Sequence, residues 1–389
     1  MKKLGKKLAA AGLIAGMTMS VLTGCSSANV NATVATMDGQ EIKLGEVLVA
    51  LRTGQASTES YLGSMFGEGN IWEQDLMGSG EAYGVSYKEQ VMESFKERLI
   101  LEKHMADYGI ELTEEEKTAI SDAADQFLAD NSKEVLKEIG ADKDTVSRVL
   151  TLYTIEAKMS SAIKAEADTN VTDEEAAQKT IEYALFSTAN TTDEEGKTVE
   201  LTEEEKEAVK KQAQDTIDLV KGGEAFADAI KEVDENKTTL TNSYGADSVL
   251  SEALTTAADQ LKDGEICAEP VETENGWYVV QMVTTFDEEA TEQKKEEIIS
   301  DRQNERYQEV LEGWEPESFE INSKVWDKVT FADKFVLKSE ETEAETAEAA
   351  TEAATTEAAT ETAATEEETE TAEAATTEAA SETESETVK

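Results

Sequence analysis

The apolar residues of this chain follow two different periods, and the change near residue 172 constrains the fold most. Before it, apolar positions recur every three to four residues, as on one face of a helix; Val91, Phe95 and Leu99 are an example. After it, "KTIEYALFST" alternates, and "GWYVVQM" is an apolar run that follows an Asn-Gly turn pair. The pattern predicts an α+β chain, in which a mostly helical module accompanies a compact α+β module.

The helical module is predicted to span residues 34–170. It opens with a short hairpin around an Asp-Gly turn and continues as long helices. Ser86 and Glu89 have the spacing of a capping box at the start of one helix, and Thr113 is the predicted cap of the next.

The α+β module is predicted to span residues 172–287, in the order strand, helix, helix, loop, helix, strand. Thr202 and Glu205 form a predicted capping box for its first long helix. Residues 288–338 add an amphipathic helix and the aromatic stretch "PESFEINSKVWDKVTFADKFVL". Because the α+β module is self-contained, we expect this stretch to pack on the helical module.

The N-terminal segment has the features of a secretory signal peptide, predicted over residues 1–24. Four lysines precede an apolar run that is short for a transmembrane helix. The run ends in "LTGC", which resembles the lipobox of bacterial lipoproteins. The resemblance implies cleavage before Cys25 and lipidation of that residue, with residues 25–33 as a tether to the membrane. The alternative is an ordinary signal peptide with an incidental cysteine.

The C-terminal residues 339–389 consist almost entirely of Ala, Thr and Glu. Such a segment cannot bury enough apolar surface to offset its chain entropy, so we predict a disordered, solvated tail. Its 17 glutamates and single lysine give it a net charge of −16, within −51 for the whole chain. So acidic a chain is not expected to bind nucleic acid, which requires a basic face.

The scarcity of histidine and cysteine excludes several kinds of catalytic chemistry. The chain has one histidine, His104, and two cysteines, Cys25 and Cys267. A zinc site needs three or four such ligands, and a Ser-His-Asp enzyme would have to use His104, which we interpret as an ordinary helix residue. The carboxylates show no spacing typical of a calcium loop. No metal and no cofactor is expected.

Several stretches together resemble known families. "GGEAFA", "AADQLKDGEI" and "GWYVV", in this order, resemble the parvulin (PpiC-type) peptidyl-prolyl isomerase domain. "VATMDGQEIKLGEV" and "GIELTEEE" resemble the SurA-type chaperone domain. With the lipoprotein signal, the arrangement looks like that of PrsA-type foldase lipoproteins of Gram-positive bacteria.

This resemblance implies an inserted parvulin-like domain within a SurA-like chaperone domain that the C-terminal helix rejoins. It implies a foldase, lipid-anchored at the extracytoplasmic face of the cell membrane, whose partners are unfolded or partly folded secreted polypeptides. It leaves a homodimer through the helical module open. A chaperone needs an exposed apolar groove, which we expect around residues 91–105 together with "SFEINSKVW".

The resemblance also places an isomerase site on this sequence, residue by residue. Tyrosines occupy both positions where parvulins carry histidine, and a further pocket position carries Asp259 rather than an aromatic residue. The catalytic positions are Tyr183, Asn236 and Tyr278, and the expected substrate pocket contains Leu250, Leu254 and Trp277.

Three questions stay open at this point. The two tyrosines either pack as ordinary strand residues or form a weakened hydrogen-bond network, since a phenol can donate and accept; we predict little or no isomerase activity. A non-catalytic surface lipoprotein, a binding or adhesion component, is the alternative function, although solute-binding lipoproteins usually alternate strands and helices over two lobes. A third hypothesis makes the acidic tail the functional part, binding cations or basic secreted proteins.

Overall fold

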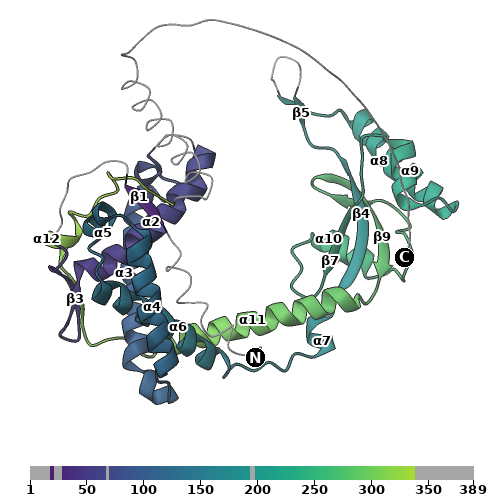
Figure 1. The fold of residues 1–389 in the computed structure, drawn as a ribbon. Helices are drawn as coiled ribbons and strands as arrows, with labels where there is room; N and C mark the ends of the chain where they lie inside the picture. Colours follow the sequence, from purple (N-terminus) through teal and green to yellow (C-terminus); the bar gives the residue numbers. More distant parts are fainter. Residues whose placement is uncertain (1–17, 22–28, 67–69, 193–197, 338–389) are drawn as a thin grey trace, which may run out of the picture.

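The computed structural model describes residues 18–21, 29–66, 70–192 and 198–337. Figure 1 shows a helical part and an α+β part, connected by the long helix α11 (Glu288–Glu312). This arrangement confirms the predicted α+β fold class, including the C-terminal helix that returns to the helical part. The predicted tail, Cys25 and most of the predicted signal peptide lie outside the described residues.

The helical part begins with a hairpin and continues as helices whose caps are legible in the sequence. Thr113 and Glu116 form a reciprocal capping box at the start of α4, as the Thr113 prediction requires. The prediction for Ser86 is wrong: α3 begins three residues earlier, and the Ser86 hydroxyl lies inside the helix, donating to the Tyr83 carbonyl at 3.0 Å. The elements are β2 (Thr33–Met37), β3 (Gln40–Lys43), α2 (Leu44–Phe66), η1 (Ile71–Glu73), α3 (Tyr83–Lys103), η2 (Met105–Tyr108), α4 (Glu114–Asp130), α5 (Lys133–Ile139) and α6 (Lys143–Lys164).

The C-terminal aromatic stretch packs on this helical part. Strand β10 (Phe319–Ile321) pairs antiparallel with β2, which pairs with β3. Trp326, in the short helix α12 (Ser323–Trp326), is buried in the main core of the helical part. The Lys88 ammonium of α3 donates to the carbonyl oxygens of Trp326 and Val329 at 2.8 and 2.9 Å, which fixes the stretch against α3.

A second, smaller pairing joins the two ends of the described chain. Strand β1 (Met19–Val21) pairs antiparallel with β11 (Phe335–Leu337). Met19 is fully buried in an apolar cluster with residues of α2, α4, α5 and α6. Part of the predicted signal peptide is therefore seated in the core of this chain.

The α+β part is built on a four-stranded antiparallel sheet in the order β7-β4-β9-β8. Thr202 and Glu205 form the predicted capping box at the start of α8. Apolar residues of β4, β9, α8, α9 and α10 form one core. The elements are α7 (Asp173–Ala176), β4 (Lys179–Ser187), β5 (Thr191–Thr192), β6 (Thr198–Val199), α8 (Glu203–Lys221), α9 (Phe226–Val233), β7 (Leu240–Tyr244), α10 (Glu252–Ala258), β8 (Val271–Thr273) and β9 (Gly276–Thr284).

Helix α11 runs from the α+β part across to the helical part, which its C-terminal end reaches near α6 (Figure 1). Its cap, Asp287, accepts from the Ala290 amide at 3.0 Å and from the Thr180 hydroxyl at 2.6 Å, which ties the helix start to β4. Farther along, Arg306 pairs with Glu166 beyond the end of α6 at 2.7 Å. Within the described ranges, no helix has both the length and the apolar character needed to cross a membrane.

Candidate functional site

The two tyrosines at the expected catalytic positions lie on the same face of the sheet. Tyr183 of β4 is opposite Val280 of β9, and Tyr278 of β9 is opposite Leu185, so the tyrosines are diagonal neighbours. Their ring centroids are 5.9 Å apart and the planes are inclined by 52°. The structure thus brings together the two positions that the family resemblance predicts to be catalytic.

Tyr183 is closed off rather than poised for chemistry. Its side chain is 9% exposed, and its hydroxyl donates to the Asn242 carboxamide oxygen of β7 at 3.0 Å. Burial, followed by the nearby Tyr278, raises the pKa of Tyr183 above its ordinary value. The phenol is therefore neutral at physiological pH, and its one proton is already in use.

The other expected site residues do not converge on this pair. Asn236 is exposed in the turn between α9 and β7, where its amide donates to Asp234 at 3.1 Å. Trp277 is opposite Phe186, on the other face of the sheet, with the Lys210 ammonium 4.4 Å from its ring centroid. Leu254 is buried in the core of the α+β part, and Leu250 packs against the same core half-buried.

Asp259 belongs to a polar cluster, whereas the family resemblance predicts an apolar pocket wall at this position. Its carboxylate accepts from the Lys179 ammonium and from the Tyr244 hydroxyl, both at 2.7 Å. Burial works against its ionisation, but the two hydrogen bonds lower the pKa of Asp259 overall. In the sequence, the charged residue at position 259 was the signal that this wall is polar rather than apolar.

Neither Cys267 nor His104 offers catalytic chemistry. Cys267 is 5% exposed, and burial raises the pKa of its thiol although the Val280 amide donates to its sulfur at 3.4 Å, so it does not present a thiolate. His104 ends α3, stacks on Trp314 with ring centroids 4.2 Å apart, and has Nδ1 2.7 Å from the Asp107 carboxylate. Among the described residues, no group of three or more His, Cys, Asp or Glu side chains is placed to hold a metal.

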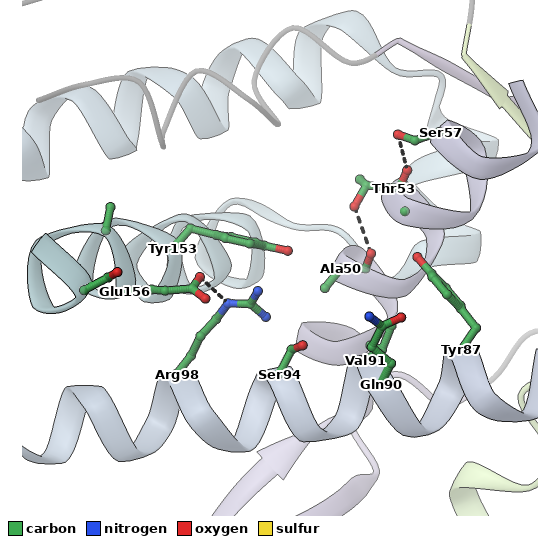
Figure 2. Close-up of a pocket in the computed structure, with 13 residues that line it drawn as sticks. Ala50, Thr53, Ser57, Tyr87, Gln90, Val91, Ser94, Arg98, Tyr153 and Glu156 are labelled. Carbon is green, nitrogen blue, oxygen red and sulfur yellow. Dashed lines mark hydrogen bonds and ion pairs between the residues drawn. The ribbon is translucent and has the colours of Figure 1, made fainter. Parts of the chain in front are cut away.

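An open hollow of about 720 Å³ lies elsewhere, between α2, α3 and α6 of the helical part. Figure 2 shows the three helices facing one another across it. Many of its lining residues are small, which is what leaves the space between the helices. The lining consists of Ala50, Thr53, Gly54, Ser57, Tyr87, Gln90, Val91, Ser94, Arg98, Tyr153, Glu156, Ala157 and Ser160.

Several polar groups of the hollow form hydrogen bonds within the protein. The Thr53 hydroxyl donates to the Ala50 carbonyl at 3.0 Å, and the Ser57 hydroxyl donates to the Thr53 carbonyl at 3.0 Å (Figure 2). Arg98 donates to Glu156 at 2.8 Å and lies 4.2 Å from the ring centroid of Tyr153. A ligand therefore meets methyl, methylene and aromatic surface, the polar side chains of Gln90, Ser94 and Ser160, and the Arg98–Glu156 ion pair.

Tyr87 forms one end of the hollow and is held by an aromatic cluster. Its ring packs against Trp72 and Phe331 with centroid distances of 5.1 and 6.0 Å. A Cβ at Gly54 would lie 1.9 Å from the Tyr87 hydroxyl oxygen, so only glycine lets the ring approach α2 this closely. Burial raises the pKa of Tyr87 to about 12.

The expected chaperone groove is found in part. Helix α3 supplies Val91, Ser94 and Arg98 to the hollow, within the predicted residues 91–105. The "SFEINSKVW" stretch supplies no lining residue. Trp326 of α12 belongs to the main core, and Phe319 of β10 packs half-buried against the same core where β10 pairs with β2.

Comparison with known proteins assigns a class to the α+β part. Residues 183–298 match the family model of the PPIC-type PPIase domain, so the chain carries a domain of this class. The match begins at Tyr183 and includes Tyr278, the two positions described above. A search of the curated proteins finds no significant match.

Solved structures that overlap with this chain include foldases and chaperones. A peptidylprolyl isomerase (PrsA) from Bacillus cereus is 16% identical, with 68% of this chain and 96% of that one covered and a TM-score of 0.29. PrsA from Bacillus subtilis is 14% identical, with 80% and 97% covered and a TM-score of 0.22. A structure of the SurA-like chaperones PEB4 and Cj1289 from Campylobacter jejuni is 15% identical, with 74% and 100% covered and a TM-score of 0.19. At these identities and TM-scores, the overlaps establish no common activity.

Proposed function

We propose that this protein is a foldase or chaperone, anchored by lipid at the extracytoplasmic face of the membrane, whose PPIC-type domain has little or no isomerase activity. The observation that carries the proposal is the contrast between its two candidate sites. On the tyrosine face of the sheet, Tyr183 is buried and hydrogen-bonded and Tyr278 is half-buried, whereas the hollow between α2, α3 and α6 is open and mostly apolar.

The physical demands of prolyl isomerisation support a weak or absent activity. The barrier to rotation about the peptide bond is about 18–20 kcal/mol, and a catalyst lowers it by gripping proline and weakening amide resonance with placed hydrogen bonds. Here the Tyr183 hydroxyl already donates to Asn242, and Asn236 lies in an exposed turn. Of the three groups expected to act on the substrate amide, one is engaged elsewhere and one lies in a turn, which leaves the half-buried Tyr278.

The hollow suits unfolded polypeptide as a client. An unfolded chain presents apolar side chains of varied shape, and a wide hollow lined by small residues accepts them without a fixed geometry. Two of its hydroxyls, those of Thr53 and Ser57, are bonded to helix carbonyls, so a client need not supply polar partners for them. The lipobox at Cys25 supports placement at the membrane surface, where secreted proteins emerge unfolded.

Two assays on the chain from Ser26 onward test the proposal. With a proline-containing peptide, we expect isomerisation at the uncatalysed rate; a rate well above background would contradict the loss of activity. With a chemically unfolded protein, we expect suppression of aggregation. Absence of suppression would favour the alternative, a surface lipoprotein that acts only in binding or adhesion. A homodimer through the helical part stays a prediction, which sedimentation of the same protein tests.

A further inference from the structure

We propose that the slot now filled by β1 is a second client-binding site, which takes an extended peptide segment with an apolar side chain of about the size of methionine. The predicted signal peptide would fill the slot in the precursor, and cleavage before Cys25 would open it. This inference rests on the proposed function, because it requires signal-peptide removal and unfolded clients.

The backbone of β11 forms one wall of the slot. The Phe335 amide donates to the Glu59 carboxylate at 2.9 Å, and the Leu337 amide donates to the Ser60 hydroxyl at 3.1 Å, so both point to α2. Since successive amides of a strand point in opposite directions, Val336 presents its N–H and C=O to the other side. There it is opposite Ser20 of β1. This edge of β11 is thus available only to a strand in the position of β1.

The floor of the slot is an apolar hole that a single side chain fills. Met19 is 0% exposed and belongs to a cluster with Phe127, Ile139 and Phe335. Its amide donates to the Asn131 carboxamide oxygen at 2.8 Å, in a buried position. The Asn131 amide nitrogen donates in turn to the Phe127 carbonyl at 2.9 Å, which holds that oxygen toward the slot.

Removal of the predicted signal peptide would change all three features at once. The β11 edge would lose its partner strand, the hole would lose Met19, and the Asn131 oxygen would lose the Met19 amide. An unpaired strand edge beside an apolar pocket is the arrangement that binds peptides by strand addition. Backbone hydrogen bonds give affinity without regard to sequence, and the hole selects one apolar side chain. Such recognition fits clients of many sequences.

Nuclear magnetic resonance on the chain from Ser26 onward tests the site, with a peptide of Thr18–Val21 flanked by Gly-Ser as the probe. We expect the Val336 amide to exchange rapidly with solvent in this protein and to become protected when the peptide is added. The Phe335 and Leu337 amides, which bond to α2, are internal controls and should change little. In the precursor, the Val336 amide should be protected without added peptide.

Matched peptides distinguish strand addition from non-specific hydrophobic binding. A Met19→Asp peptide should bind at least about tenfold more weakly, because the hole excludes a charge. A Ser20→Pro peptide should lose a similar factor, because proline removes the amide that faces Val336. A Ser20→Thr peptide should bind like the parent, and an unfolded client should displace it.

Four results would overturn the inference. They are no protection of Val336 at millimolar peptide, equal binding of the proline peptide, occupation of the edge by a second copy of the chain, and intact residues 1–24 in the protein isolated from cells. None of the first three would affect the proposed function, because suppression of aggregation through the hollow is measured separately. Loss of aggregation suppression with an intact peptide site would instead reject the hollow as a client-binding site and leave the proposal for the slot standing.

Discussion

The two parts of this molecule differ in how open their candidate sites are to a ligand. In the α+β part, the rings of Tyr183 and Tyr278 contact each other, and the hydroxyl of Tyr183 is bonded to Asn242. In the helical part, a hollow of about 720 Å³ is bordered by small residues of three helices. The difference shows that the fold of a part does not by itself decide where a ligand can bind. The fold positions the sheet, and only the side chains on it determine the chemistry.

The frame of the α+β part depends on one glycine, and its substitution should have the largest effect. Gly276 opens β9 at φ 129°, and a Cβ there would lie 2.3 Å from the Phe186 carbonyl oxygen and 2.7 Å from the Thr188 amide. Both neighbours are backbone atoms of the paired chain and cannot move aside. We expect Gly276→Ala to lower the free energy of unfolding of this part by about 3 kcal/mol, measured by urea unfolding with hydrogen exchange of the β4 and β9 amides.

Gly264→Ala is the matched control for this substitution. Gly264 also has a positive φ, 77°, but a Cβ there would meet no atom within 4 Å. We expect a cost of about 1 kcal/mol from backbone conformation alone. Equal costs at the two positions would show that the close approach at Gly276 is not what holds the sheet.

The hollow should show its own dependence on pH through Tyr87. Burial raises the pKa of Tyr87 to about 12 in the folded protein, while the unfolded chain ionises near 10.0. The stability that the neutral phenol contributes is therefore complete below pH 10 and lost as pH rises toward 12. Tyr87→Phe should lose less stability than wild type between pH 9 and pH 11, by about 1 kcal/mol in urea unfolding. Parallel curves for the two proteins would contradict the burial of this hydroxyl.

Restoring histidines should not restore isomerase activity, and this is the smallest expected effect. In a Tyr183→His, Tyr278→His double variant, Asn236 would still lie in the turn after α9, and Asp259 would still be engaged by Lys179 and Tyr244. We expect the proline-peptide assay to stay at the uncatalysed rate. A clear gain in isomerisation rate would mean that the site lacks only two imidazoles. The difference between the two parts of the molecule would then come down to the side chains at two positions.

Local rules were enough to predict much of the fold. The boxes at Thr113 and Thr202 mark helix starts because a side-chain oxygen and a glutamate three residues later satisfy free amides in any context. The same reasoning failed at Ser86, where the helix begins at Tyr83 without a side-chain cap. The Tyr83 ring stacks on Trp72, with centroids 5.3 Å apart. A contact between residues so far from the cap pattern is not visible in local spacing.

The candidate sites were less predictable than the fold. The pairing of Tyr183 with Tyr278 followed from family positions, and Trp277 lies on the opposite face because consecutive residues of a strand alternate. That Trp277 is opposite Phe186 depends on strand register, which a sequence alone does not settle. The hollow was predicted only along α3. Its other walls come from α2 and α6, where Gly54, Ser57 and Ala157 look like ordinary small helix residues. Such residues matter because they leave space between the helices. That space is defined only when the helices are packed together.

The measurement that tests the central claim most directly is suppression of aggregation by Ser94→Trp. Ser94 lines the hollow on α3, and an indole there fills space that a client would need. Glu93→Trp is the control, because Glu93 is exposed on the neighbouring position of the same helix. If clients bind in the hollow, Ser94→Trp should require at least about tenfold more protein for equal suppression, while Glu93→Trp behaves like wild type. Equal suppression by Ser94→Trp and wild type, with both proteins folded, would contradict the account.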